Sequence, residues 1–293
     1  MYPASFRYLR PRSLAEALEF LTRHGEEAKL LAGGHSLLPA MKLRLASPRY
    51  LIDIGGLREL RGIDTSPGEM VIGALTLHAE IAASDSVRRL LPGLAEAASV
   101  IGDLQVRNRG TIGGSVAHAD PGADFPVILT ALSAAFVLQS SSGKRRVAAD
   151  GFFRDFFTTA LAPDEILTEI RIPLPPRGAG TAYAKLGHPA SGYAVVSAGA
   201  WLIVDSAGNC ESARVAVGGL DGIPRRAAAT EAALQGRPLT AENIAAAAAR
   251  AADGAKAEGD TYASAEYKLH VATVFARRAI EAAAGRAGRQ DRA

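Results

Sequence analysis

Hydrophobic residues recur with two different periods over the first 56 positions. Leu14, Leu18 and Leu21 are three or four residues apart and share one face of a predicted helix. Ser13 precedes this helix and Glu16 follows three residues later, which is typical of a capping box. Short apolar runs at residues 29–31 and 49–54 fit buried strands. This alternation predicts a small parallel α/β unit over residues 1–56.

The second segment, residues 57–176, mixes the two periods. Strands are predicted at residues 70–75, 134–138 and 165–172. A helix is predicted over residues 87–101, with a break at Pro92 and Gly93. The proline-rich residues 173–176, followed by Arg177 and Gly178, predict a linker.

The third segment, residues 178–285, begins with strands and ends with helices. Strands are predicted at residues 181–186, 194–204 and 213–217, with a hairpin turn at 206–209. The chain is alanine-rich and helical in pattern after Thr230, and Thr240 and Ser264 are predicted N-caps. Strands followed by helices predict an α+β domain.

Composition and charge exclude several classes of protein. The 293 residues carry 33 basic and 30 acidic side chains, so the net charge is +3, too small to indicate nucleic-acid binding. One cysteine, Cys210, cannot form an internal disulfide or an iron–sulfur cluster, which takes about four thiolates. The six histidines are far apart, so no metal site is predicted. We expect a cytoplasmic protein, because no signal-peptide pattern or membrane-length apolar run occurs.

Common catalytic and nucleotide-binding motifs are also missing. The sequence contains neither G-x-G-x-x-G nor a P-loop. Gly113-Gly114-Ser115 resembles the start of a nucleophile elbow, although Ala117 stands where the motif ends in glycine. A serine hydrolase that uses Ser115 is therefore one alternative, with His188 or His270 as its base.

Two of the four Gly-Gly pairs are followed at once by a hydroxyl-bearing residue or by His-Ser. They lie in residues 32–36 and 111–115. Glycine allows a close approach of backbone to ligand, and consecutive N–H groups form an anion-binding nest. Ser36 is a predicted N-cap of the helix that contains Pro39. Two such loops on separate segments can hold the two phosphates of a pyrophosphate, whereas the pairs at 55–56 and 218–219 are predicted plain turns.

Through these loops the sequence resembles the FAD-binding medium subunit of molybdenum hydroxylases, the family of carbon monoxide dehydrogenase and xanthine dehydrogenase. The resemblance is carried by residues 29–45 and 111–124 and extends to residues 165–173 and 265–280. It implies an α+β fold in three parts. A two-lobed FAD-binding domain has a small α/β lobe (1–56) and a mixed α+β lobe (57–176). A C-terminal α+β domain (178–285) has antiparallel strands and a helical end.

The resemblance also implies which residues bind FAD. The first loop would line the pyrophosphate and adenosine side, and the second would supply a second phosphate cradle. The implied contacts are Lys29, Leu30, Leu31, Ala32, Gly33, Gly34, His35 and Ser36 in the first loop, Thr111, Ile112, Gly113, Gly114 and Ser115 in the second, and Ile101, Asp124, Leu167, Lys185 and Tyr193 elsewhere.

Each isolated residue also has a plainer interpretation. Ile101 and Leu167 would be core residues in any fold. Asp124 could be an N-cap, Lys185 a solvated surface lysine, and Tyr193 an aromatic residue that opens a strand.

The function implied by the resemblance is electron transfer. A large molybdenum-cofactor subunit would oxidise the substrate, and a small iron–sulfur subunit would pass the electrons to FAD on this chain. The assembly would be a heterotrimer or a dimer of heterotrimers, and the final acceptor would be external. The chain would need no catalytic acid or base and no metal. A self-sufficient FAD-dependent oxidoreductase remains an alternative.

Overall fold

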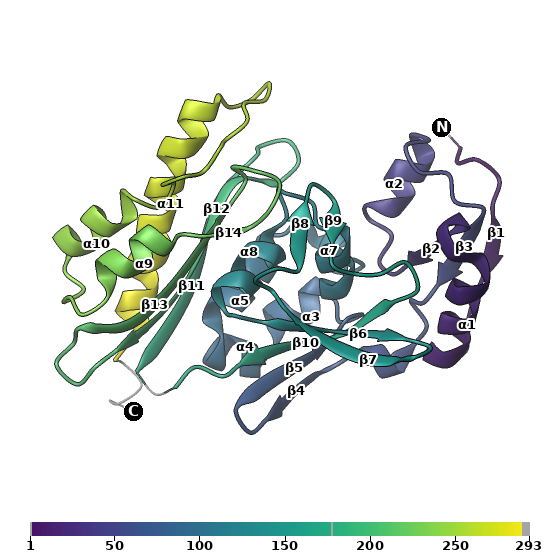
Figure 1. Ribbon diagram of the computed structural model, residues 1–293, viewed down its shortest axis with the longest axis horizontal. Coiled ribbons are helices and arrows are strands. Elements are labelled where there is room, and N and C mark those ends of the chain that lie inside the picture. Colours follow the sequence, from purple (N-terminus) through teal and green to yellow (C-terminus); the bar gives the residue numbers. More distant parts are fainter. Residues whose placement is uncertain (1, 177, 289–293) are drawn as a thin grey trace.

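The computed structural model describes residues 2–176 and 178–288. The three parts of the chain follow one another along the long axis of the molecule, each with its own sheet (Figure 1). This arrangement confirms the predicted fold class, a two-lobed α+β domain followed by an α+β domain with antiparallel strands and a helical end. None of the described helices combines the length and apolar character needed to cross a membrane.

The first lobe is a parallel three-stranded sheet in the order β1-β3-β2. Leu18 and Leu21 of the first helix pack against Ile52 of the central strand. Ser13 caps that helix as predicted, accepting a hydrogen bond from the Glu16 N–H at 3.2 Å. The elements are β1 (Arg7–Leu9), α1 (Leu14–His24), η1 (Gly25–Glu27), β2 (Ala28–Leu31), α2 (Leu37–Lys42), β3 (Tyr50–Asp53) and η2 (Arg58–Leu60).

The second lobe is an antiparallel five-stranded sheet in the order β4-β5-β10-β6-β7, together with six helices. The predicted long helix is broken at Pro92, because proline at the first helical position ends one helix and starts the next. The strands are β4 (Ile63–Ser66), β5 (Glu69–Gly73), β6 (Ala135–Ser140), β7 (Gly143–Ala148) and β10 (Ile166–Pro173), with a small hairpin of β8 (Phe153–Asp155) and β9 (Thr158–Thr159). The helices are α3 (His78–Ala83), α4 (Asp85–Leu90), α5 (Pro92–Ser99), α6 (Leu104–Arg107), α7 (Ile112–His118) and α8 (Asp124–Ala131).

The C-terminal sheet is covered on both faces. Helices α9 to α11 pack on one face, and α5 and α8 of the second lobe pack on the other. Thr240 and Ser264 cap α10 and α11, as predicted. The elements are β11 (Ala179–Gly187), β12 (Ala194–Val204), β13 (Cys210–Gly218), β14 (Arg225–Arg226), α9 (Ala228–Leu234), α10 (Ala241–Ala248) and α11 (Ala265–Arg286).

One pair of glycines differs from its prediction. Gly218 and Gly219 were predicted as a plain turn, but both pack closely against neighbouring segments. A Cβ on Gly219 would overlap the carbonyl of Val195, and one on Gly218 would overlap the Val127 side chain. Gly218 therefore allows β13 to approach α8, Gly219 allows the segment after β13 to approach the start of β12, and neither position tolerates a side chain.

Candidate cofactor site

The first glycine loop lies between β2 and α2. Among the residues that the structure describes, none accepts a hydrogen bond from the backbone N–H groups of residues 33–37. Gly34 has a φ of +79°, the left-handed conformation that favours glycine. Five consecutive backbone donors are thus left available to a ligand, which is the pattern of an anion-binding nest. Ser36 stands at the N-cap position of α2, but its side chain makes no capping hydrogen bond, so that prediction is wrong.

The second glycine loop is built differently. Thr111 is the N-cap of α7 and accepts a hydrogen bond from the Gly114 N–H at 3.1 Å. The N–H groups of Ile112 and Gly113 donate to carbonyls of the turn after β5, at Thr76 and Ala74. The N–H of Ser115 donates to the Thr111 carbonyl. The expectation of open N–H groups in this loop is therefore wrong, because these N–H groups are hydrogen-bonded within the protein and anchor the start of α7.

The glycines of the two loops bring the loops into contact. A Cβ on Gly33 would overlap the carbonyl oxygen of Arg109 and lie 2.9 Å from the Cα of Gly110. A Cβ on Gly114 would lie 3.9 Å from the Cβ of Ala32. Gly113 faces the other way and packs on Ala74, where a Cβ would come within 2.5 Å of the Ala74 Cβ. Gly33 and Gly114 thus lie at the junction of the loops, and Gly113 supports the fold.

Asp124 and Lys185 form an ion pair at the boundary between the second lobe and the C-terminal domain. Their Oδ1 and Nζ atoms are 2.7 Å apart, and the side chains are only 5% and 8% exposed. The hydroxyl of Tyr183 donates to the same Oδ1 atom, also at 2.7 Å. Burial raises the pKa of Asp124, and the charge of Lys185 opposes that shift. The plainer interpretations of both residues are wrong, because Ala123 is the N-cap of α8 and Lys185 is buried.

Tyr193 lies directly before β12 and is 44% exposed. Burial of part of its ring raises the pKa of Tyr193, and the nearby Ser36 hydroxyl of the first loop opposes that shift. Lys185 Nζ donates to the Gly192 carbonyl at 2.8 Å, and a Cβ on Gly192 would lie 3.5 Å from the Cα of Gly102. The segment before Tyr193 is thus held against the second lobe.

The other predicted residues are more scattered. Residues 28–31 form the edge strand β2, on which Lys29 is exposed. His35 is exposed in the first loop. Ile101 is half-buried against the main core, and Leu167 is fully inside it. The structure therefore brings together residues 32–36, 111–115 and Tyr193, while Leu167 and Lys29 lie outside this cluster.

Two residues of the site region were missed from the sequence. Tyr183 lies two positions before Lys185 on β11, so the strand period places both on one face, but it does not show that they reach Asp124. His78 lies against Gly110 beneath the loop junction, and no local pattern singled it out among the six histidines.

We predict that Gly34→Val lowers FAD affinity about tenfold, or about 1.4 kcal/mol. The positive φ makes valine strained, and its side chain would press on Leu31 and Leu38. FAD affinity, measured by flavin fluorescence on the complex assembled with its partner subunits, checks this. The matched control is Gly68→Val, because Gly68 has a φ of +83° in the same domain with nothing within 4 Å of its Cβ position. If both variants lose FAD affinity equally, backbone strain in the domain explains the effect, and the first loop has no special role.

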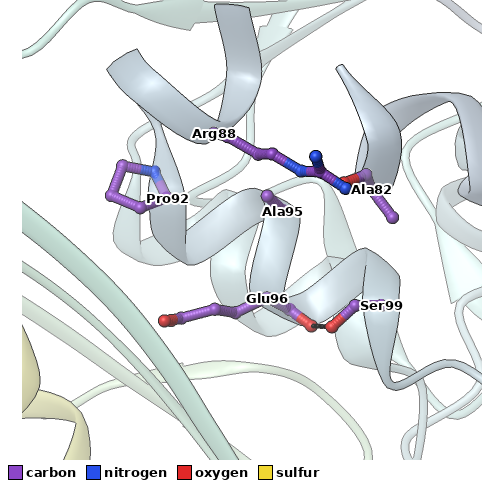
Figure 2. Close-up of a pocket in the computed structure, with 6 residues that line it drawn as sticks. All are labelled: Ala82, Arg88, Pro92, Ala95, Glu96 and Ser99. Carbon is purple, nitrogen blue, oxygen red and sulfur yellow. Dashed lines mark hydrogen bonds between the residues drawn. The ribbon is translucent and has the colours of Figure 1, made fainter. Parts of the chain in front are cut away.

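A surface hollow of about 270 Å³ lies on α3 to α5, away from the loops (Figure 2). Its polar groups are already bonded to neighbours: Arg88 Nε donates to the Ala82 carbonyl and the Ser99 hydroxyl to the Glu96 carbonyl. None of the predicted site residues lines it.

Ser115 lacks the partners of a catalytic serine, since no histidine among the described residues is hydrogen-bonded to its hydroxyl.

Comparison with known proteins gives a consistent result over both parts of the chain. Residues 4–175 match the family described as the FAD binding domain in molybdopterin dehydrogenase, and residues 181–283 match the CO dehydrogenase flavoprotein C-terminal domain. The chain is 43% identical to the carbon monoxide dehydrogenase medium chain of Hydrogenophaga pseudoflava, over 97% of this chain and 98% of that one. It is 39% identical to the glyceraldehyde dehydrogenase medium chain of Sulfolobus acidocaldarius, over 96% and 99%.

A solved structure of carbon monoxide dehydrogenase from Hydrogenophaga pseudoflava superimposes with a TM-score of 0.94 at 43% identity. The match covers 98% of this chain and all of that one. The fold and the paired loops define a flavoprotein subunit of an oxidoreductase. This chain belongs to the family of FAD-binding medium subunits of the molybdenum hydroxylases. The open N–H groups of residues 33–37 fit the pyrophosphate of the family's cofactor, FAD.

Proposed function

We propose that this chain receives electrons from iron–sulfur clusters on a small subunit and passes them through FAD to an external acceptor. A large subunit with the molybdenum cofactor would oxidise the substrate. The observation that carries the proposal is the convergence of three segments: the open first loop, the second loop packed on it, and Tyr193 from the C-terminal domain. Medium chains of carbon monoxide and glyceraldehyde dehydrogenases among the relatives support it.

The chemistry of the single cysteine supports a division of labour between chains. Cys210 is buried, and burial raises its pKa to about 11, so its thiol stays protonated. An iron–sulfur cluster takes about four thiolates, which this sequence does not contain. Electrons that reach FAD through clusters must therefore come from another chain.

In this proposal each part of the site has one role. The N–H groups of residues 33–37 bind the pyrophosphate, and Gly33 and Gly114 hold the two loops together. Asp124 is held in place by Tyr183 and Lys185, both of which bond its Oδ1, and its carboxylate would accept a hydrogen bond from a hydroxyl of the cofactor. Tyr193 covers the isoalloxazine ring. FAD supplies the redox chemistry, and the chain orients it.

Tyr193→Ala in the assembled complex tests the proposal. We expect the variant to keep most of its FAD, because the phosphate contacts lie in the first loop, but to change flavin fluorescence and the rate of flavin reoxidation. Reduction of the iron–sulfur clusters by substrate should be unchanged. The control is Tyr267→Ala, since Tyr267 is similarly exposed but lies on α11. The proposal fails if fluorescence and reoxidation are unaltered by Tyr193→Ala, or if substrate reduces the flavin of this chain without its partners.

A further inference from the structure

His78 lies beneath the point where the two loops meet. It begins α3, and its backbone N–H donates to the Gly110 carbonyl at 3.0 Å. Its ring occupies the space that a side chain on Gly110 would fill: a Cβ there would lie 2.5 Å from Nε2. The other side of Gly110 faces Gly33. His78, Gly110 and Gly33 thus form three successive layers, from the interior to the first loop.

The imidazole is buried with one nitrogen unsatisfied. The residue is 5% exposed, and Nδ1 has no hydrogen-bond partner within residues 2–176 and 178–288. The ring meets Phe125 edge to face, with centroids 5.1 Å apart. Whichever nitrogen carries the proton of the neutral ring, an imidazolium would carry an N–H at Nδ1 with no acceptor among the described residues.

The surroundings keep this ring neutral. Burial, together with charge repulsion from His35 of the first loop and Arg107 of α6, lowers the pKa of His78 to about 4. On its own helix, the Glu80 carboxylate accepts a hydrogen bond from the Leu77 N–H. On α8, the neighbouring element, Phe125 faces the ring, and Asp124 is paired with Lys185. No described carboxylate is bonded to His78 and available to stabilise an imidazolium.

We propose that His78 is a positioning residue of the FAD site, whose neutral ring supports Gly110 and thereby holds the first loop in its FAD-binding position. This inference rests on the proposed contact between FAD and residues 33–37. Protonation would place a charge and a second N–H where no acceptor exists, so a protonated His78 must leave its position. The loop junction then opens, and FAD can escape.

The pH dependence follows from linkage. A solvated His78 has a pKa of 6.5, whereas the buried ring has one of about 4. The open state therefore gains a proton below pH 6.5 that the closed state does not bind until about pH 4. Opening becomes about tenfold more frequent for each pH unit between these values. If FAD leaves through the open state, its release rate rises by the same factor.

The experiment measures FAD release from the complex assembled with its partner subunits, as free-flavin fluorescence after dilution at pH 7, 6 and 5. We expect release from the wild type to accelerate by more than tenfold between pH 7 and pH 5. His78→Gln, which is neutral and similar in size, should release FAD at the wild-type pH 7 rate at every pH. His78→Ala removes the support and should release FAD faster throughout. His118→Gln is the matched control, because burial also lowers the pKa of that histidine, on α7 beside Phe157.

The inference is overturned if wild type and His78→Gln accelerate equally in acid, or if His118→Gln alone removes the acceleration. If His78→Ala fails to assemble, the comparison of wild type with His78→Gln decides the question. If residues 33–37 do not bind FAD at all, a variant of Gly33 would also leave FAD binding unchanged. That result separates a failure of the loop assignment from a failure of the role of His78.

Discussion

Gly33→Ala is expected to lower the affinity of the assembled complex for FAD by about tenfold to a hundredfold. The new methyl group would overlap the Arg109 carbonyl, which is backbone and cannot rotate away, so the two loops must separate. Overpacking of this kind costs about 1–3 kcal/mol, and here the cost falls on the conformation that aims the N–H groups of residues 33–37. FAD affinity measured by flavin fluorescence, together with the flavin content of the purified complex, checks the result.

Gly56→Ala is the matched control for this substitution. Gly56 lies in the same lobe, and the nearest atom to its Cβ position is Arg10 Nη2 at 3.6 Å, an ordinary contact. The two variants should differ in FAD content and agree in assembly. In the Gly33→Ala complex, substrate should still reduce the clusters while transfer to the external acceptor is lost. Full flavin occupancy of Gly33→Ala would refute the importance of the loop junction.

Lys185→Met is expected to destabilise the chain by about 3–5 kcal/mol, the usual cost of removing one partner from a buried ion pair. The substitution leaves the Asp124 carboxylate buried with only the Tyr183 hydroxyl as a side-chain partner. It also frees the Gly192 carbonyl, so the segment that carries Tyr193 loses one of its contacts. The free energy of unfolding from denaturant titration measures the first effect, and flavin fluorescence measures the second.

A double-mutant cycle separates the stability lost with the ion pair from the stability lost through changed packing. Asp124→Asn in the Lys185→Met background removes the unpaired charge and should recover part of the lost stability. Lys268→Met serves as a comparison, because the Lys268 partner Asp260 is half exposed and needs no compensation when the lysine is lost. If the double variant is no more stable than Lys185→Met alone, charge burial is not the cause of the destabilisation.

The strands that the sequence predicted most accurately are those with continuous apolar runs. β12 has the predicted bounds, β2 begins one residue earlier than predicted, and β3 is one residue shorter at each end. β7 was missed because four of its six residues are glycine or charged, and only pairing with the buried β6 makes it a strand. α7 was missed because its first turn is Ile112-Gly113-Gly114, and glycine disfavours helix unless caps and packing compensate.

The candidate site was predictable where its signal is local. In the first loop, two adjacent glycines followed by His-Ser are visible in the sequence, and the structure shows open N–H groups there. In the second loop, the sequence does not reveal that Thr76 and Ala74, in a turn about 40 residues earlier, accept hydrogen bonds from Ile112 and Gly113. The Asp124–Lys185 pair joins two residues on different domains, and no period along the chain reveals such a contact.

The ion pair between Asp124 and Lys185 joins the second lobe to the C-terminal domain. In the proposed function, FAD bound where these domains meet would also fasten them together. Binding to the folded state alone stabilises it by about 2.7 kcal/mol at a ligand concentration of 100 Kd, and here that energy is shared by segments far apart in sequence. On this proposal, the chain without bound flavin is expected to be cleaved by a protease faster than the chain that holds it.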